Sequence, residues 1–420
     1  MKLAQIAKIS VHCTVAFLTS YLSRFVAEPI FFITKRKQKN SNINLSQVKR
    51  VLVIRLDEIG DVVMTTPFLR ELRRNLPYAH ITLVVKPAIY NLVELCPYVN
   101  EILTYNWKVS RYLAPFQRHW RAVLLSYRHI WGHHYDLAIV PRWDTDYYHA
   151  SFIAYFSGAQ WRVGYSEKVN ERKKCLNRGF DHLFTHILYD NTLKHEVEHN
   201  LDVIRFIGGT VQEDQLELWT SKEDVTFGEQ VLKSHNLTSN KVLLIAFVPG
   251  AGAPKRMWPL ENFVELGMWL KRTYHVRIVV FGGIEDWFMG QKLQAQLGDT
   301  VINLVGKTTL RQTSALLKHC QLYVGNDTGS MHLAAAVGVP IIEISCHPVH
   351  GSLLHANSPR RFGPWGVRSQ VLQPEKAIFP CSDECLAEKA HCILGIQIED
   401  VKKAVMYLLS KQNNSFFLKE

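Results

Sequence analysis

Apolar and polar residues alternate along the chain in a pattern that predicts strands alternating with helices. Between residues 48 and 165, we expect strands at the apolar runs VKRVLVIRL, HITLVV, NEILTY, YDLAIVPRW and WRVGY, and a helix over residues 61–75. The same alternation begins again at residue 241, with KVLLIAFVPGAG, HVRIVVFGG, LYVGNDTG and VPIIEIS. Strands that alternate with helices indicate βαβ units, so the chain is predicted to be α/β with two Rossmann-like domains.

The 420 residues suit two domains preceded by a distinct N-terminal segment. We assign residues 1–45 to an apolar and basic segment, residues 46–215 to the first domain and residues 216–420 to the second. Two such sheets facing a central cleft would place a ligand at the carboxyl ends of their strands.

The N-terminal segment is predicted to lie on a membrane surface. Its longest uncharged run, residues 9–23, is too short to span a bilayer comfortably, and a basic run follows at residues 35–39. A helix lying in the interface, with a polybasic flank, fits this composition. Two alternatives are a helix packed on the protein's own core and an export signal.

The net charge indicates the kind of binding partner, and the cysteine content indicates the redox compartment. The net charge of +12 suits an anionic partner, which could be nucleic acid, an acidic membrane surface or a phosphorylated substrate. The eight cysteines do not form the dense framework of a small secreted domain, so we expect reduced thiols in a cytosol.

Three loops that follow strands in the second domain have the composition of a diphosphate site. Residues 327–330 precede an Ala-rich helix, whose free N–H groups favour an anion, although Asp and Thr are also ordinary helix caps. Lys255 and Arg256 add positive charge after the glycine-rich turn that contains Gly250. In FGGIEDW, Glu285 and Asp286 are placed where a carboxylate could hold ribose hydroxyls.

This combination favours a nucleotide sugar over other nucleotides. No Walker-type lysine loop and no G-x-G-x-x-G follows any predicted strand, so an ATPase or a dehydrogenase is not indicated. In the first domain, RLDEIGDVVMTTP places Asp61 after a glycine turn at a strand end. There a carboxylate could deprotonate a sugar hydroxyl or simply cap a helix.

Taken together, these residues resemble glycosyltransferase family 9, the ADP-heptose:lipopolysaccharide heptosyltransferases. The resemblance covers about residues 50–410 and rests on four ordered motifs. They are R-x-D-x-I-G-D-x-V-x-T-x-P at residues 55–67, H-x-V-E-x-N-L at 195–201, R-x-W-P at 256–259 and D-T-G-x-x-H-x-A-A at 327–335.

The resemblance implies a GT-B fold, an N-terminal acceptor domain, a C-terminal donor domain and no required metal or cofactor. It implies that Asp61 is the general base and that Arg256 holds the diphosphate, with Lys255 sharing or taking over that role. The donor-binding residues implied or predicted are Asp327, Thr328, Gly329, His332, Glu285 and Gly250.

The expected activity is inverting transfer of heptose from ADP-heptose to an anionic lipopolysaccharide core acceptor. We expect a cytoplasmic protein, peripherally associated with the inner membrane, that does not bind nucleic acid. The alternatives are another nucleotide sugar, an acceptor other than lipopolysaccharide, and a non-catalytic nucleotide-sugar-binding protein.

Three further motifs resemble metal-binding sites, and we expect none of them to bind a metal. His195 to His199 match H-E-x-x-H, the zinc protease pattern, but no third ligand with the right spacing follows. Asp144 lies in a D-x-D away from the diphosphate loops, so contact of Arg142 or Asp144 with the acceptor sugar is expected instead. Cys381, Cys385 and Cys392 lie near His391 with a spacing that is not that of a standard zinc site, so we expect buried thiols.

Overall fold

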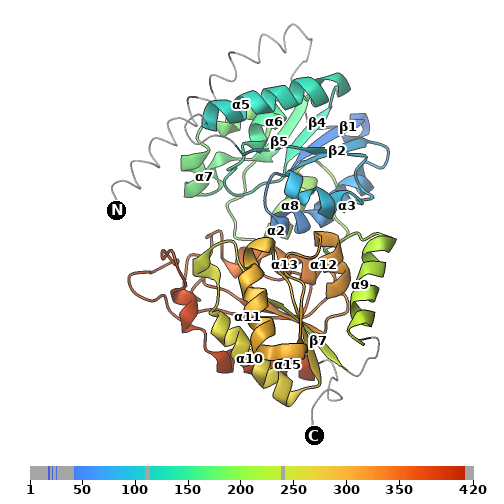
Figure 1. The fold of residues 1–420 in the computed structure, drawn as a ribbon. Helices are drawn as coiled ribbons and strands as arrows, with labels where there is room; N and C mark the ends of the chain where they lie inside the picture. Colours follow the sequence, from blue (N-terminus) through green and yellow to red (C-terminus); the bar gives the residue numbers. More distant parts are fainter. Residues whose placement is uncertain are drawn as a thin grey trace. The chain divides into compact units, whose positions relative to one another are not determined.

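The computed structural model describes residues 42–108, 114–237 and 242–411, together with Leu18, Tyr21 and Phe25 (Figure 1). The predicted membrane-surface segment therefore lies almost entirely outside the described residues. Of its described side chains, Phe25 is 78% exposed, and the Tyr21 hydroxyl hydrogen-bonds with Nε2 of His182 at 2.6 Å. Among the described helices, none is both long and apolar enough to cross a membrane.

Two parallel sheets of six strands each form the framework. The strands of the first are β1 (Arg50–Ile54), β2 (His80–Val85), β3 (Glu101–Thr104), β4 (Leu137–Val140), β5 (Trp161–Tyr165) and β6 (His186–Leu188). Those of the second are β7 (Leu243–Val248), β8 (Val276–Val280), β9 (Val301–Asn303), β10 (Leu322–Asn326), β11 (Ile341–Ile344) and β12 (Ser369–Leu372).

Helices connect these strands. In chain order they are α2 (Ile59–Val63), α3 (Thr66–Asn75), α4 (Tyr90–Val93), α5 (Ala114–Leu125), α6 (Ala150–Phe156), α7 (Glu171–Leu176), α8 (Glu196–Phe206), α9 (Lys222–Ser234), α10 (Leu260–Thr273), α11 (Trp287–Leu297), α12 (Leu310–Leu317), α13 (Gly329–Ala336), α14 (Pro359–Phe362) and α15 (Ile398–Ser410). In the second unit α10 packs against both α11 and α15, and α9 packs on α12 (Figure 1).

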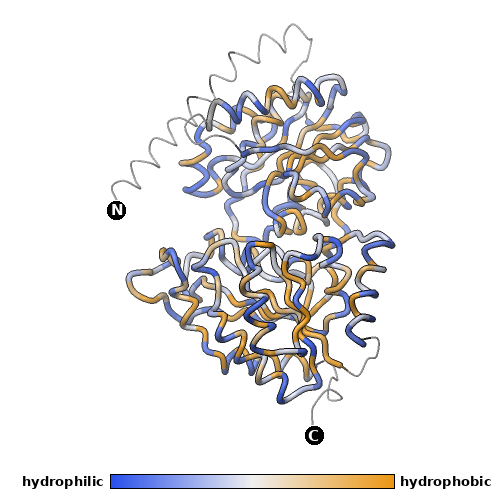
Figure 2. The backbone as a smooth tube through the Cα atoms, viewed as in Figure 1, coloured by the Kyte–Doolittle hydropathy of each residue, from blue (hydrophilic) through white to orange (hydrophobic). Residues whose placement is uncertain are grey.

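Both sheets have the strand order of a Rossmann fold. The first runs β3-β2-β1-β4-β5-β6 and the second β9-β8-β7-β10-β11-β12, so each follows the doubly wound 3-2-1-4-5-6 pattern. Their central strands are buried on both faces, as β7 is at all six positions, which explains the continuous apolar runs of the sequence. Figure 2 shows these hydrophobic stretches along the strands inside each unit. The predicted α/β class with two Rossmann-like domains is confirmed.

The chain divides into two compact units. The first comprises the described residues within 1–58, 65–90 and 96–214, and the second comprises those within 59–64, 91–95 and 215–420. Helix α2 therefore packs with the second unit, although it directly follows the first strand of the other sheet.

The structure differs from the pattern-based prediction at three short strands and in the helix expected over residues 61–75, which begins at Ile59 and so includes Gly60, the residue predicted to form a turn. Strands β6, β9 and β12 were not predicted, and all three lie at sheet edges and have only three or four residues. The single helix expected over residues 61–75 is two helices, α2 and α3, with a proline at the start of α3. Proline favours the first turn of a helix but interrupts a continuous one, so Pro67 marks the division.

Candidate active site

The strand order of the second sheet reverses between β7 and β10. In doubly wound sheets, ligands bind at the carboxyl ends of the strands at this switch point. Residues 249–259 follow β7 and residues 327–330 follow β10, and both segments contain predicted phosphate-binding residues. The fold thus brings two of the three predicted loops to the place where such sheets bind ligands.

Asn326, the last residue of β10, links these two loops through hydrogen bonds of its side chain. Its side-chain amide donates to the carbonyl of Pro249 at 2.7 Å, and its side-chain oxygen accepts from the Trp258 amide at 3.0 Å. The Asn326 side chain is fully buried. We did not predict this residue, although a polar side chain that ends an apolar strand before D-T-G is a usable signal.

Arg256 lies beside Asp327 at the centre of this region. The Arg256 guanidinium contacts the Asp327 carboxylate at 2.7 Å and also donates to the Asp327 carbonyl oxygen. Burial raises the pKa of the Asp327 carboxyl above its usual range, while the attraction of Arg256 opposes that rise. Since the Arg256 side chain is still 23% exposed, its charge is accessible to an anionic ligand.

A second carboxyl interacts electrostatically with this pair. Glu343 on β11 is 1% exposed, and burial together with the nearby Asp327 carboxylate raises the pKa of Glu343 well above its usual range. This shift favours the neutral form of Glu343, and a neutral carboxyl repels an anion near Arg256 less than a carboxylate would.

Two glycines let α2 approach α13 closely within the second unit. A β-carbon at Gly60 would lie 2.4 Å from Cδ2 of His332, and one at Gly329 would lie 2.7 Å from Cβ of Ile59. Both distances are below van der Waals contact, so only glycine fits without displacement. Asp61 follows directly, and its charge contributes to the raised pKa of Asp327.

The structure therefore brings six predicted residues together in the second unit. They are Asp61, Arg256, Asp327, Thr328, Gly329 and His332. The Thr328 hydroxyl lies 3.4 Å from the hydroxyl of Tyr323, and Thr328 is the residue that precedes the first turn of α13. Here a carboxylate, a guanidinium and the N-terminal end of an eight-residue helix lie close to one another.

The two carboxylates of FGGIEDW occupy different positions. Asp286 is 8% exposed, accepts from the Gly283 amide at 3.2 Å and lies where a β-carbon at Gly250 would clash with it. Burial raises the pKa of Asp286. Glu285 is exposed in the 3-10 turn η8 (Ile284–Asp286) that follows β8. Asp286 thus shapes the loop beside Gly250, and the predicted ribose-binding Glu285 remains accessible.

Lys255 has a different partner from Arg256. Its ammonium group donates to the carbonyl oxygen of Cys385 at 2.7 Å, which ties the loop after β7 to a distant part of the second unit. The two adjacent cations, predicted as a pair, therefore have separate partners: Arg256 contacts Asp327 and Lys255 contacts the Cys385 backbone.

The predicted acceptor-binding residues lie in the first unit, after β4. Arg142 contacts the Asp57 carboxylate at 3.3 Å, and Asp57 also pairs with Arg55 at 3.2 Å. Asp144 is 4% exposed and accepts from the Thr145 amide at 2.7 Å. The Asp144 carboxylate also accepts from the side-chain amide of Asn170 at 3.3 Å, so it links its own loop to the residue before α7.

The other acid of the D-x-D, Asp146, caps α6. Its carboxylate accepts from the amides of Ala150 at 3.0 Å and Ser151 at 2.8 Å. Neither Asp144 nor Asp146 belongs to a group that could hold a metal among the described residues.

A polar cluster that we did not predict follows β1 and β2 in the first unit. Glu58 accepts from the Lys86 ammonium and from the Tyr148 hydroxyl, both at 2.6 Å, and the ammonium lies 3.7 Å from the centre of the Tyr148 ring. Burial is the main cause that raises the pKa of Tyr148. The signal in the sequence is a charged residue in the loop after each of two apolar strands: Lys86 directly follows β2, and Glu58 lies in the loop between β1 and α2.

The two histidines of H-E-x-x-H have separate environments. Ring Nδ1 of His195 accepts from the Val197 amide at 3.3 Å, which caps α8. His199 is fully buried and stacks on Trp143, with ring centroids 4.5 Å apart. His199 lies near Asp190 and Asp202, but the Lys194 ammonium binds both of these carboxylates, at 2.6 and 2.7 Å.

Comparison with known proteins gives a family for this chain. Residues 126–391 match the family model of glycosyltransferase family 9 (heptosyltransferase). The lipopolysaccharide core heptosyltransferase OpsX of Haemophilus influenzae is 21% identical over 296 residues, which is 70% of this chain and 78% of the relative.

Solved structures agree with the fold. A family 9 glycosyltransferase from Veillonella parvula superposes with a TM-score of 0.70 at 23% identity, over 89% of this chain and all of the other. The E. coli ADP-heptose lipopolysaccharide heptosyltransferase II gives a TM-score of 0.62 at 22% identity, over 87% of this chain and 99% of its own. With two Rossmann-like sheets of the GT-B type and a family model matched over more than half its length, this chain belongs to glycosyltransferase family 9.

Proposed function

We propose that this protein is an inverting heptosyltransferase that transfers heptose from ADP-heptose to an acidic lipopolysaccharide core acceptor. The observation that carries the proposal is the placement of Asp61 beside the Asp327–Gly329 loop and Arg256 in one compact unit. The names of the Haemophilus and E. coli relatives, which specify lipopolysaccharide core and ADP-heptose, support this choice of substrates.

In the proposed reaction the Asp61 carboxylate accepts the proton of an acceptor hydroxyl. That oxygen forms a bond to the anomeric carbon from the face opposite the diphosphate, and configuration inverts. The bond between the anomeric carbon and the diphosphate oxygen breaks, and ADP leaves with the electron pair. Proton removal by a positioned carboxylate typically contributes about 10²- to 10⁴-fold to a rate.

The leaving diphosphate gains negative charge, which Arg256 and the N–H groups at the start of α13 would stabilise; the exposure of Arg256 and the helix start at Gly329 support this role. Because a fixed guanidinium supplies this charge, we propose that the transfer itself needs no divalent metal at the diphosphate. The exposed Glu285 would bind the ribose hydroxyls, and Gly250 lets the loop after β7 lie close to its neighbours. Turnover should therefore not depend on added Mg²⁺.

The test measures ADP release from ADP-L-glycero-D-manno-heptose with and without a heptose-free lipopolysaccharide precursor. We expect acceptor-dependent release by the wild type and a loss of at least about 100-fold in Asp61→Asn, with ADP affinity unchanged by calorimetry. Asp299→Asn, which changes an exposed aspartate of the same unit, serves as the matched control. Full turnover by Asp61→Asn would refute the general base, and release with a different nucleotide sugar would refute the donor.

We also propose that the enzyme acts at the cytoplasmic face of the inner membrane, where its glycolipid acceptor is anchored. The net charge of +12 and the basic run at residues 35–39 support this location. Flotation with vesicles tests it: binding should require anionic lipid, weaken with salt and decrease when Lys35, Arg36, Lys37 and Lys39 are replaced by glutamine. Equal binding to neutral vesicles would contradict it.

A further inference from the structure

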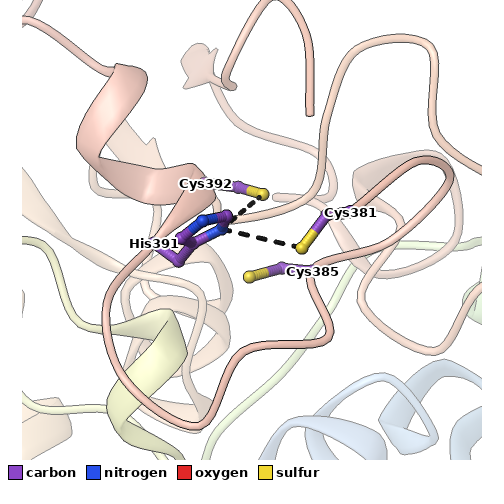
Figure 3. A group of neighbouring side chains, drawn as sticks. All are labelled: Cys381, Cys385, His391 and Cys392. Atoms are coloured by element: carbon purple, nitrogen blue, oxygen red, sulfur yellow. Dashed lines mark hydrogen bonds between the residues drawn. The ribbon is translucent and has the colours of Figure 1, made fainter. Parts of the chain in front are cut away.

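Three cysteines and a histidine converge in the segment between β12 and α15 (Figure 3). The ligand atoms of Cys381, Cys385, His391 and Cys392 all lie within 4.8 Å of one another. The three cysteines are free thiols and are at most 8% exposed. They form a closed set of four donors, apart from the residues proposed for transfer.

Two distances within this set match the separation of a nitrogen and a sulfur bound to one tetrahedral metal ion. Nδ1 of His391 lies 3.6 Å from Sγ of Cys381 and 3.5 Å from Sγ of Cys392. A sulfur and a nitrogen bound to one tetrahedral zinc ion lie about 3.6 Å apart, given Zn–S and Zn–N bonds of about 2.3 and 2.0–2.1 Å. Three thiolates and one imidazole are also a usual donor set for structural zinc.

The surrounding segment explains why a metal would be useful there. The 25 residues between Leu372 and Ile398 contain no helix or strand apart from the short 3-10 turn η10 (Cys392–Gly395). Segments of this length without regular structure are uncommon in compact domains and need some other source of order. A metal held by four side chains would provide that order, because binding free energy contributes directly to folding.

We propose that Cys381, Cys385, Cys392 and His391 bind one structural transition-metal ion, with zinc as the ion that fits the donor set. The spacing of these residues along the chain led us to expect buried thiols. Their convergence in space favours a ligand set instead. The four ligands are distinct from the residues proposed for transfer, because no residue of the transfer site belongs to the set.

The segment that would hold the metal also supports the loop that carries Arg256. Lys255 donates to the Cys385 carbonyl at 2.7 Å, and the Trp258 indole donates to the Ile396 carbonyl at 3.0 Å. Lys255 and Trp258 lie on either side of Arg256 in the sequence. If a bound metal orders the segment between β12 and α15, these two contacts would hold the Arg256 guanidinium in position. This consequence, unlike the metal site itself, rests on the proposed function.

Elemental analysis of the purified full-length protein, kept under reductant and without chelator, tests the metal site. We expect about one equivalent of zinc per chain in the wild type, and loss of that metal in Cys385→Ser and Cys392→Ser. Cys320→Ser is the matched control, because Cys320 is a buried free thiol of the same unit outside the cluster, and it should retain the metal.

A second measurement uses only the wild-type protein, so it does not require that any variant folds. Wild-type protein stripped of metal and reconstituted with Co²⁺ should show the absorption bands of tetrahedral cobalt bound to thiolates. One equivalent of iron in place of zinc would support the four-residue site and overturn only the choice of ion. A wild type that binds neither zinc nor cobalt after reconstitution would overturn the proposal.

Hydrogen exchange and ADP affinity test the positioning role. Removing the metal should increase amide exchange over residues 254–258 and weaken ADP binding, whereas Cys320→Ser should change neither. If metal binds and exchange responds but no heptose is transferred, the metal site stands and the proposed function fails. If removal of the metal leaves residues 254–258 unchanged, the positioning role is refuted.

Discussion

The imidazole of His332 lies directly against Gly60, so closely that a β-carbon at residue 60 would lie 2.4 Å from its Cδ2 atom. His332 is 4% exposed and therefore has little room to move aside. This contact, together with the one between Gly329 and Ile59, holds α2 against the start of α13. It thereby fixes where Asp61 lies relative to the D-T-G loop.

Gly60→Ala should destabilise the protein by about 1–3 kcal/mol, because the added methyl group overpacks this contact. Urea unfolding measures the change. Combining Gly60→Ala with His332→Ala should recover part of the loss, since the clash would then be absent. Gly132→Ala is the control. No neighbouring atom lies within 4 Å of its added β-carbon, so the midpoint of its urea unfolding curve should hardly change.

Arg256→Ala should lower kcat by about 10²- to 10³-fold, as expected when one fixed group that stabilises developing charge is removed. Arg256→Lys should recover only part of that loss, because lysine cannot make the bidentate contacts of arginine. Steady-state kinetics with varied ADP-heptose would measure both changes. Arg272→Ala, at an exposed arginine on α10, should leave kcat unchanged. An unaffected kcat in Arg256→Ala would contradict the assignment.

Glu343 should make stability fall as pH rises. Its pKa in the folded protein lies well above its usual range, so above that usual range the folded state retains a proton that the unfolded chain has lost. The free energy of unfolding therefore decreases with increasing pH until the folded-state pKa is passed.

Replacing Glu343 with glutamine removes this titration. Relative to the wild type, Glu343→Gln should gain thermal stability as pH is raised from 5 to 8, which melting curves in matched buffers would show. Glu229→Gln, at an exposed position on α9, provides the control. A difference in melting temperature that stays constant with pH would argue against a raised pKa for Glu343.

Asn326→Ala should loosen the loop after β7 without unfolding β10. The substitution removes the hydrogen bonds to the Pro249 carbonyl and the Trp258 amide and leaves these buried groups unpaired, at a cost of about 1–3 kcal/mol each. Hydrogen exchange should show loss of protection at the Trp258 amide. Unchanged protection there would mean that other contacts hold the loop.

The central strands and the chemistry at their ends were predictable because both are local properties of the sequence. A strand buried on both faces needs a continuous apolar run, and the residue after it lies at the edge of the sheet whatever the remaining chain does. The position of Asp327 directly after β10 followed from this, whereas Arg256 and Glu285 lie further along the loops that follow β7 and β8. Strands β6 and β12 were missed because they are short and only partly buried, and β9 because three residues are too few to form a pattern.

Only the tertiary structure decided which residues that are distant in the chain contact one another. The sequence contains Gly60 and His332, Lys255 and Cys385, or Asn326 and Trp258, but no periodicity links the members of each pair. Contact between them depends on how strands and helices pack, which is a property of the whole unit. The same holds for Cys381 and His391, since chain spacing indicated buried thiols and only folding brought four ligand atoms together.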